Sequence, residues 1–177
     1  SAAISDQLHR ADLILTSGGV SMGAYDTVKE VFSSYGTVEF IKVAMHPGMP
    51  QGHGVVGESD DERIPVITLP GNPVSSYISF QNFVRPAINK LRGLGSTDRP
   101  RLAVEVTKPL DSPQSKRQFA RGRFLDDGRV EPVGGGQGSH VIGGLAQADC
   151  LIVIPEGVAH VNAGDTVDVV DLRGDVG

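Results

Sequence analysis

The decisive stretch of the sequence is IPVITLPGNPVSS, which runs from Ile64 to Ser76. Its first six residues, Ile64–Leu69, form a continuous apolar run, which is typical of a strand buried on both faces of a sheet. Asn72 then stands where a helix N-cap belongs, and Pro73 suits the first position of a helix. A buried strand followed at once by a capped helix indicates an α/β fold.

The residues before this stretch repeat the alternation. Ala11–Thr16 (ADLILT) predicts a second buried strand. Ala24–Tyr35 predicts a helix that ends at Gly36, because glycine is favoured at helix C-caps. Val38–Ala44 alternates apolar and polar residues, so we expect a further strand there.

The helix that begins at Asn72 is the best marked in the chain. Pro86 is expected to bend it late in its course, because proline cannot donate a helical hydrogen bond. Gly93 and Gly95 then end the helix and open a linker. Its apolar stripe is predicted at Val74, Ile78, Val84, Ile88 and Leu91.

The chain changes character after this linker, with short strand-like runs separated by glycine-rich turns. Such a pattern predicts a small all-β, barrel-like domain. We therefore expect an α/β domain over residues 1–95, a linker over 96–100 and a β-barrel domain over 101–177. The expected strands are Leu102–Val106, Gln118–Phe124, Val130–Val133, Leu151–Ile154 and Thr166–Val170.

Composition excludes several classes of protein. A net charge of −5 and no tryptophan argue against nucleic-acid binding, which needs cationic and stacking side chains. No apolar run approaches the length of a membrane span, and the first residues lack the features of a secretory signal. The single cysteine, Cys150, allows neither an internal disulfide nor a multi-thiolate metal site. We expect a cytoplasmic protein without a membrane or nucleic-acid partner.

Two glycine- and proline-rich loops are candidate ligand sites, because each follows a buried strand and precedes a helix. The first is Thr16–Gly23 (TSGGVSMG), and the second is Leu69–Ser76 (LPGNPVSS). Backbone N–H groups and the helix N-terminus favour a phosphate or another oxyanion at such a loop. The two loops are expected at the same edge of the sheet, where open α/β folds bind ligands. The alternative is that both are structural turns.

Further candidates are charged or titratable residues outside these two loops. Lys42 is either an anion-binding cation or a solvated surface lysine. His46 and His53 lack neighbouring carboxylates or thiolates at ligand spacing, which disfavours a metal site. Asp26 stands in the first turn of a helix, where a carboxylate stabilises the N-terminus or binds Mg²⁺ beside a phosphate.

The β half offers fewer candidates. Arg121, in FARGR, and the loop GGGQGSH of residues 134–140 could donate hydrogen bonds to an oxyanion. Arginine on a strand is more often an exposed charge, and a triple glycine more often a turn. Cys150 precedes an apolar strand, which predicts a buried, unreactive thiol.

Together these motifs resemble one family. SGGVSMGAYD, KVAMHPGMP, LPGNPVSSYISF, QFARG and GGGQGSH occur in the order of the C-terminal part of molybdopterin molybdenumtransferase, the MoeA family, whose animal counterpart is the E domain of gephyrin. The resemblance extends from Ala11 to Leu172. It implies a three-layer α/β molybdopterin-binding domain, here lacking its first strands, followed by a small β-barrel.

The resemblance also implies an activity and a set of site residues. The family's enzyme takes adenylylated molybdopterin and molybdate, with Mg²⁺ assisting, and yields molybdenum cofactor and AMP. Asp26 matches the essential acidic residue and the metal site, and Lys42 matches a functional lysine. The remaining matches are Ser17, Gly18, Gly19 and Ser21 in the pterin-phosphate loop, Pro70, Gly71, Asn72, Pro73 and Ser75 in the proline-rich loop, and Arg121 and Ser139 beside molybdate.

The sequence departs from the family in two ways. Many relatives read Lys-Pro-Gly-Lys-Pro where this chain has His46 and Met49, so two cations are replaced. The family also has preceding domains, and we expect this stretch by itself to be inactive. The full-length form is expected to be a homodimer with a molybdopterin adenylyltransferase as possible partner. The alternative functions are a molybdopterin adenylyltransferase and a non-catalytic pterin-binding or scaffold module.

Overall fold

The chain divides into two compact units, which we call the α/β unit and the β unit. The computed structural model describes residues 6–18, 30, 32, 34–57, 59, 62–95, 98–133 and 142–174. The α/β unit comprises Ser1–Val43 and Gly48–Arg92, and the β unit comprises Ala44–Pro47 and Gly93–Gly177. The second unit therefore takes four residues from within the first half of the chain.

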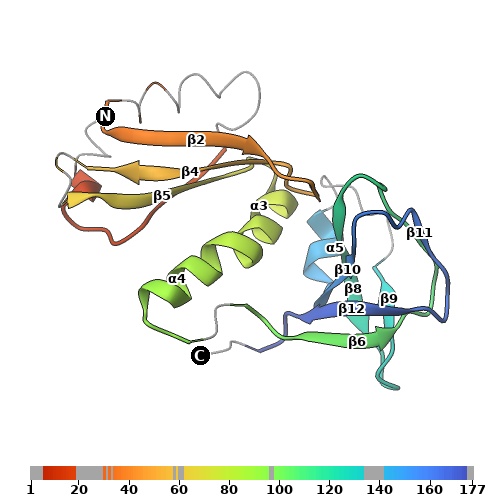
Figure 1. The fold of residues 1–177 in the computed structure, drawn as a ribbon. Coiled ribbons are helices and arrows are strands. Elements are labelled where there is room, and N and C mark those ends of the chain that lie inside the picture. Colours follow the sequence, from red (N-terminus) through yellow and green to blue (C-terminus); the bar gives the residue numbers. More distant parts are fainter. Residues whose placement is uncertain are drawn as a thin grey trace. The chain divides into compact units, whose positions relative to one another are not determined.

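The α/β unit is built on a four-stranded sheet (Figure 1). Its strands, in spatial order, are β1 (Ile14–Ser17), β5 (Ile64–Leu69), β4 (Pro50–Val56) and β2 (Gly36–Lys42). β1 pairs in parallel with β5, whereas β4 is antiparallel to both β5 and β2. As a result β1, β5 and β2 run in the same direction and end at the same edge of the sheet.

The sequence correctly predicted β5, and it predicted β1 and β2 with shifts at their ends. It did not predict β4, because the sequence PQGHGVV contains one proline and two glycines, which are typical of a loop. Gly36 was also wrongly predicted to cap a helix. It is the first residue of β2, opposite Val56, where a Cβ atom would lie 2.1 Å from the carbonyl oxygen of Val55.

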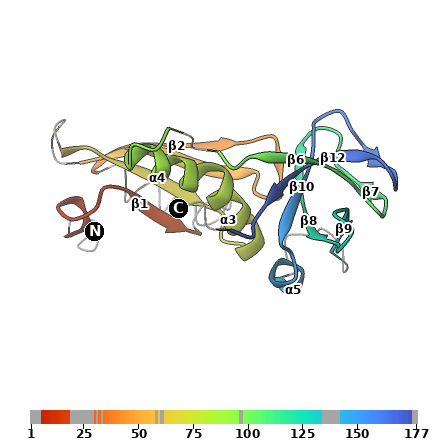
Figure 2. The same cartoon turned by 90° about the horizontal axis from the view of Figure 1, so that it is seen from below.

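The long helix lies along one face of this sheet (Figures 1 and 2). It consists of α3 (Pro73–Ser79), a π-helical turn η2 (Phe80–Val84) and α4 (Arg85–Leu91). Pro86 cannot donate to a carbonyl four residues earlier, and a π-helical turn precedes it. The π-helical turn holds more residues than a turn of α-helix, so it rotates the residues of α4 relative to the apolar stripe of α3. Asn89 is buried as a result, and Leu91, which the stripe predicted in the core, is 54% exposed. Most of the predicted helix over 24–35 lies outside the described residues.

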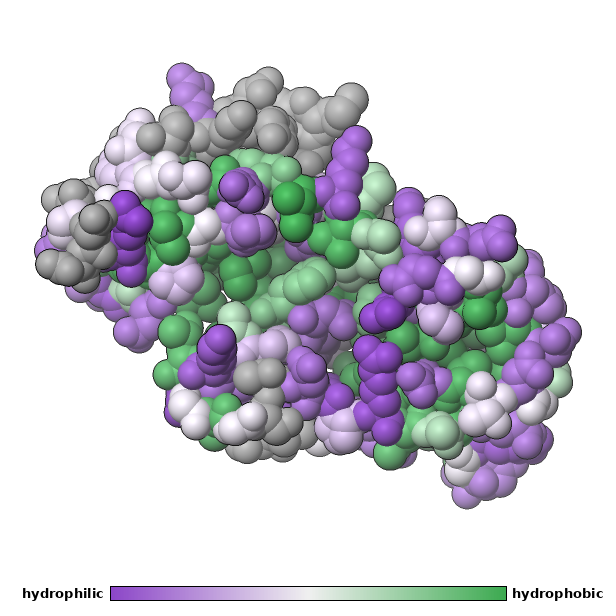
Figure 3. All heavy atoms as spheres, viewed as in Figure 1, coloured by the Kyte–Doolittle hydropathy of each residue, from purple (hydrophilic) through white to green (hydrophobic). Residues whose placement is uncertain are grey.

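Hydrophobic side chains fill the space between this helix and the sheet. On the face shown in Figure 3 they lie between the strands and the helix of the α/β unit. A small cavity of about 200 Å³ remains there, and its apolar lining includes Ile41, Ile67 and Phe83. On the other face of the sheet Phe32, Val56 and Val66 are buried in a second cluster.

The β unit contains a six-stranded sheet and a two-stranded sheet. All five strands predicted in this half are present, and the short helix α5 (Ile142–Ala146) is an addition. The large sheet has the order β3 (Met45–His46), β8 (Arg117–Phe124), β10 (Cys150–Ile154), β12 (Thr166–Asp171) and β6 (Arg101–Glu105). A further strand of this sheet, β9 (Val130–Pro132), pairs with β8. The small sheet consists of β7 (Leu110–Asp111) and β11 (His160–Val161).

The core of the β unit lies on one face of this sheet, where Ala120, Ile152 and Val169 are fully buried. Cys150 belongs to the same cluster, which confirms the predicted buried thiol. Burial raises the pKa of this thiol far above its ordinary value, so it remains protonated. No helix in the described part of the chain has the length and hydropathy of a membrane span.

Candidate functional site

The two candidate loops touch at the end of the sheet. Ser17 and Leu69 are paired at the ends of β1 and β5, and the N–H of Gly18 donates to the carbonyl oxygen of Leu69 over 3.0 Å. Gly18 has φ +86°, which favours glycine. A Cβ atom on Gly71 would lie 3.2 Å from the Cα atom of Gly18, closer than an ordinary contact. Glycine at position 71 therefore allows the two backbones to approach closely, whereas glycine at position 18 is favoured by its positive φ.

The second loop is held by its own cap. The Asn72 side-chain oxygen accepts hydrogen bonds from the N–H groups of Val74 (3.1 Å) and Ser75 (3.3 Å). Pro73 occupies the first turn of α3, as predicted. Pro70 and Ser75 are buried, whereas Gly71 and Pro73 are exposed. A ligand at this edge therefore meets the Gly71–Pro73 turn first, and Ser75 lies beneath it.

Lys42 is brought to the same edge of the sheet. It is the last residue of β2 and pairs with Pro50, the first residue of β4. Because β2 runs in the same direction as β5, Lys42 lies at the edge where the two loops begin, and its side chain is exposed. Four other predicted site residues, Gly19, Ser21, Asp26 and Ser139, lie outside the described residues.

Two buried hydroxyl groups lie just below this edge, and sequence analysis did not single them out as a pair. Thr16 and Thr68 are partners in the β1–β5 ladder, and the Oγ1 atoms of both are buried without a hydrogen-bond partner among the described residues. Gly52 of β4 is the partner of Thr68 on the other side of β5. A Cβ atom on Gly52 would lie 2.2 Å from Thr68 Oγ1. Glycine at position 52 thus makes room for the Thr68 hydroxyl.

Gln51 links the segment after Lys42 to the helix of the second loop. Its side-chain amide donates to the carbonyl oxygen of Gly48 over 2.6 Å and to the Ser79 hydroxyl of α3 over 2.5 Å. Gln51 is 5% exposed and Ser79 is fully buried. A bond from the N–H of Val43 to the carbonyl oxygen of Met49 closes the base of the same segment. No sequence motif marks Gln51, because its partner is 28 residues away.

We expect Gln51→Leu to lower the free energy of unfolding by about 2 kcal/mol, because buried partners lose their donor. Urea unfolding followed by circular dichroism measures this loss, and amide exchange should accelerate at residues 48–51. Gln114→Leu, at an exposed glutamine, is the matched control and should change little. Equal stability of the two variants would contradict the role given to Gln51.

The β unit carries a separate group of cations. Arg121 on β8 is 1% exposed, and burial lowers the pKa of its guanidinium. A Cβ atom on Gly144 of α5 would lie 3.6 Å from Arg121 Cζ, an ordinary contact distance, so α5 lies beside the guanidinium. His46 lies on β3, opposite Gln118 of β8. Burial lowers the pKa of His46, and the charges of Lys116 and Arg121 lower it further.

The charges of Lys116 and Arg121 both act on His46, and we call these three residues of the β unit the basic cluster. The sequence pattern pointed to Arg121 and His46 but not to Lys116, because the lysine comes near His46 only through the β3–β8 pairing. A buried arginine beside further cations is suited to an oxyanion, which it can bind through several charge-assisted hydrogen bonds. Across the described residues, no group of three His, Cys, Asp or Glu side chains could hold a metal ion.

Known proteins share both units of this chain. Residues 1–90 match the family described as "Probable molybdopterin binding domain", and residues 103–172 match the "MoeA C-terminal region (domain IV)". The chain belongs to the molybdopterin-binding MoeA family. The first family covers the loops at the edge of the α/β sheet, and the second covers Arg121 and Lys116.

Individual MoeA relatives agree with this assignment. The chain is 46% identical over 169 residues to Molybdopterin molybdenumtransferase 2 of Mycobacterium tuberculosis, covering 92% of this chain and 40% of the relative. It is 35% identical over 164 residues to Molybdopterin molybdenumtransferase of Haemophilus influenzae, covering 90% and 39%. It also resembles the crystal structure of a molybdopterin biosynthesis MoeA protein from Pyrococcus horikosii, with a TM-score of 0.74, 28% identity, and coverage of 98% and 40%. The chain thus spans about 40% of the length of these relatives.

Proposed function

We propose that the protein acts in molybdenum cofactor biosynthesis, as part of a molybdopterin molybdenumtransferase. In this reaction molybdenum from molybdate enters adenylylated molybdopterin and AMP is released. The observation that carries the proposal is the contact of Gly18 with Gly71, where two loops of the family's pattern meet at one sheet edge. The names of the relatives support the same activity.

The α/β unit is proposed to bind the phosphate-bearing pterin. Backbone N–H groups of the two loops, with the hydroxyls of Ser17 and Ser21, would donate to the phosphate oxygens, and glycine allows their close approach. Lys42 would add a positive charge at the same edge. The glycine and proline residues fix the loops before binding, which reduces the entropy lost on binding.

The β unit is proposed to bind molybdate. Arg121 and Lys116 are cationic side chains, and His46 adds a third positive charge when protonated. Ser139 is proposed to donate a hydroxyl hydrogen bond to the same oxyanion. Each of these groups is a donor, which suits an anion whose oxygens only accept.

Magnesium, partners and location remain part of the proposal. Mg²⁺ would be held by Asp26, and since the described residues offer no carboxylate cluster we assign no step to the metal. A homodimer, a molybdopterin adenylyltransferase partner and a cytoplasmic location are proposed with the activity. The match of residues 103–172 to the MoeA C-terminal region favours this activity over an adenylyltransferase. A scaffold module remains the second candidate function.

Calorimetry with adenylylated molybdopterin tests the proposal on the 177-residue protein. Gly71→Val should weaken binding at least about tenfold, because the side chain would press against Gly18. Gly95→Val is the matched control, since a Cβ atom there meets nothing within 4 Å. Amide spectra should confirm that both variants fold. Unchanged affinity in folded Gly71→Val would assign the two loops a purely structural role.

His46 should make oxyanion affinity depend on pH. Because burial and neighbouring cations hold its pKa below 6.5, the imidazole is neutral at pH 7 and charges only in more acidic solution or beside a bound anion. We expect affinity for sulfate and molybdate to fall severalfold between about pH 5 and about pH 7. Calorimetry on the parent and on His46→Gln measures this, and the variant should lose most of the dependence. Parallel pH profiles would show that His46 does not contribute charge.

A further inference from the structure

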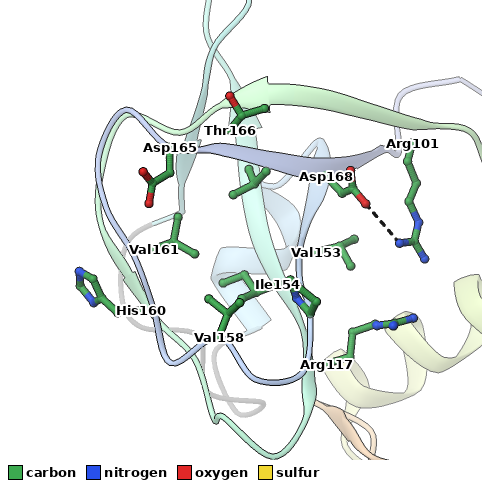
Figure 4. Close-up of a pocket in the computed structure, with 12 residues that line it drawn as sticks. Arg101, Arg117, Val153, Ile154, Val158, His160, Val161, Asp165, Thr166 and Asp168 are labelled. Carbon is green, nitrogen blue, oxygen red and sulfur yellow. Dashed lines mark hydrogen bonds and ion pairs between the residues drawn. The ribbon is translucent and has the colours of Figure 1, made fainter.

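A cavity of about 440 Å³ in the β unit is divided by the sheet that it adjoins. Figure 4 shows its lining, in which Arg101 and Asp168 form an ion pair. Asp168 and its partner Val153 lie on one face of the sheet. Val167 and Ile154 are the neighbouring residues along the two strands, so they point to the opposite face, into the core. A single ligand therefore cannot contact both groups.

The small cavity of the α/β unit, in contrast, adjoins one face of its sheet. Ile41 of β2 is paired with Gln51 of β4, and His53 of β4 is paired with Ile67 of β5. Paired residues, and residues two apart on one strand, point to the same face, so these four side chains share one face. Phe83 of η2 lines the cavity from the helix. The cavity thus lies between three strands and the helix that packs over them.

The size and lining of this cavity favour a small aromatic ring. Its volume is about 200 Å³, and an apolar cavity of about 150 Å³ is known to bind benzene. Ile41 and Ile67 offer aliphatic surface, and Phe83 offers a ring against which a second ring can pack. None of the described residues that line the cavity is Asp, Glu, Lys or Arg. A charged ligand would therefore lose its hydration without gaining a partner.

Gln51 adds one polar feature to this lining. Its amide nitrogen donates to the carbonyl oxygen of Gly48, which can only accept, so the positions of nitrogen and oxygen in this amide are fixed. The Oε1 atom is the other branch of the amide, and it is buried without a hydrogen-bond partner among the described residues. A buried acceptor without a donor is unfavourable, and a ligand that donates to it removes this cost.

We propose that this cavity binds a small uncharged aromatic molecule with one hydrogen-bond donor, as in indole. The ring lies between Phe83 and the two isoleucine side chains of the sheet, and its N–H donates to Gln51 Oε1. A plain hydrocarbon would leave Oε1 without a donor. The site is distinct from the two glycine- and proline-rich loops, because none of the lining residues belongs to them.

Calorimetry with indole on the 177-residue protein tests the proposal. Indole should bind saturably, with a Kd below about 1 mM. Benzofuran has the same size, but an oxygen replaces the N–H, so it should bind about tenfold more weakly. In Gln51→Leu the two ligands should bind with equal affinity, since leucine has no acceptor. No saturable binding of indole, or equal affinity of the parent protein for both ligands, would overturn the proposal.

Methyl NMR spectra and variants locate the binding. Indole should shift the methyl signals of Ile41 and Ile67. Ile41→Trp should weaken indole binding at least about tenfold, because the larger side chain fills the space. Leu102→Trp is the matched control, since Leu102 and Ile41 are both 43% exposed and Leu102 does not line the cavity. Equal losses in the two variants, or unshifted signals of both isoleucines, would overturn the location. Gly71→Val should bind indole as the parent does, which separates this site from the proposed pterin site.

Discussion

The substitution Gly54→Ala is expected to destabilise the α/β unit by about 3 kcal/mol, at the upper end of overpacking effects. Gly54 is in β4, which has a strand on each side, and it pairs with both Val38 and Val66. A Cβ atom would lie 2.0 Å from the carbonyl oxygen of Thr37 and 2.7 Å from the Cα atom of Val38. Both are backbone atoms, so relief requires the β2–β4 ladder itself to open.

Urea unfolding and amide hydrogen exchange measure this effect, and faster exchange is expected first in β2 and β4. Gly95→Ala is the control, because its Cβ atom would meet nothing within 4 Å and its φ is not in the left-handed region. It should be neutral or slightly stabilising, since alanine restricts the unfolded chain. A Gly54→Ala protein as stable as Gly95→Ala would mean that the β2–β4 pairing does not hold in solution.

Arg121→Met is expected to lower molybdate affinity between about tenfold and about 100-fold, because charge-assisted hydrogen bonds to the oxyanion are lost. The same change removes a buried guanidinium from the groups that it contacts, so the free energy of unfolding is also expected to fall, by about 1–3 kcal/mol. Methionine has a similar length and conserves much of the packing of the arginine stem. Arg121 is 1% exposed, so its burial carries a desolvation cost that methionine avoids.

Calorimetry with molybdate and urea unfolding separate these two effects. Arg123→Met is the matched control on the same strand, since the Arg123 side chain is 55% exposed and pairs with Glu131. It should leave molybdate affinity nearly unchanged. If Arg121→Met binds molybdate normally but is much less stable, the arginine serves the packing of α5 against β8 and not an oxyanion.

Local sequence signals predicted those elements that depend mainly on their own residue types and little on distant parts of the chain. The strand Ile64–Leu69 and the helix start at Asn72–Pro73 are examples. A strand buried on both faces is rich in apolar residues, and a helix start favours asparagine at the N-cap and proline just after it. Gly36 and β4 were missed for the opposite reason. Glycine is required there by the close approach of a neighbouring strand, and only the pairing of residues distant in sequence reveals that.

The candidate site shows the same division. The loops around Gly18 and Gly71 stood out because clustered glycine and proline follow buried strands. Lys116, Gln51 and the Thr16–Thr68 pair did not stand out, since each matters only through a partner that the fold supplies. Tertiary pairing, and not local composition, gives these residues their place.

The strand β3 gives the two units more than one covalent connection. Residues 44–47 pair with β8 in the β unit, while the residues on either side of them belong to the α/β unit. The main chain therefore passes from one unit to the other three times, after Val43, after Pro47 and after Arg92. A proteolytic cut near Gly95 would leave two of these covalent connections intact. Expressing the β unit from residue 93 onward would remove β3 and leave the Arg117–Gln118 end of β8 without a partner on that side, although β8 would still pair with β10 and β9.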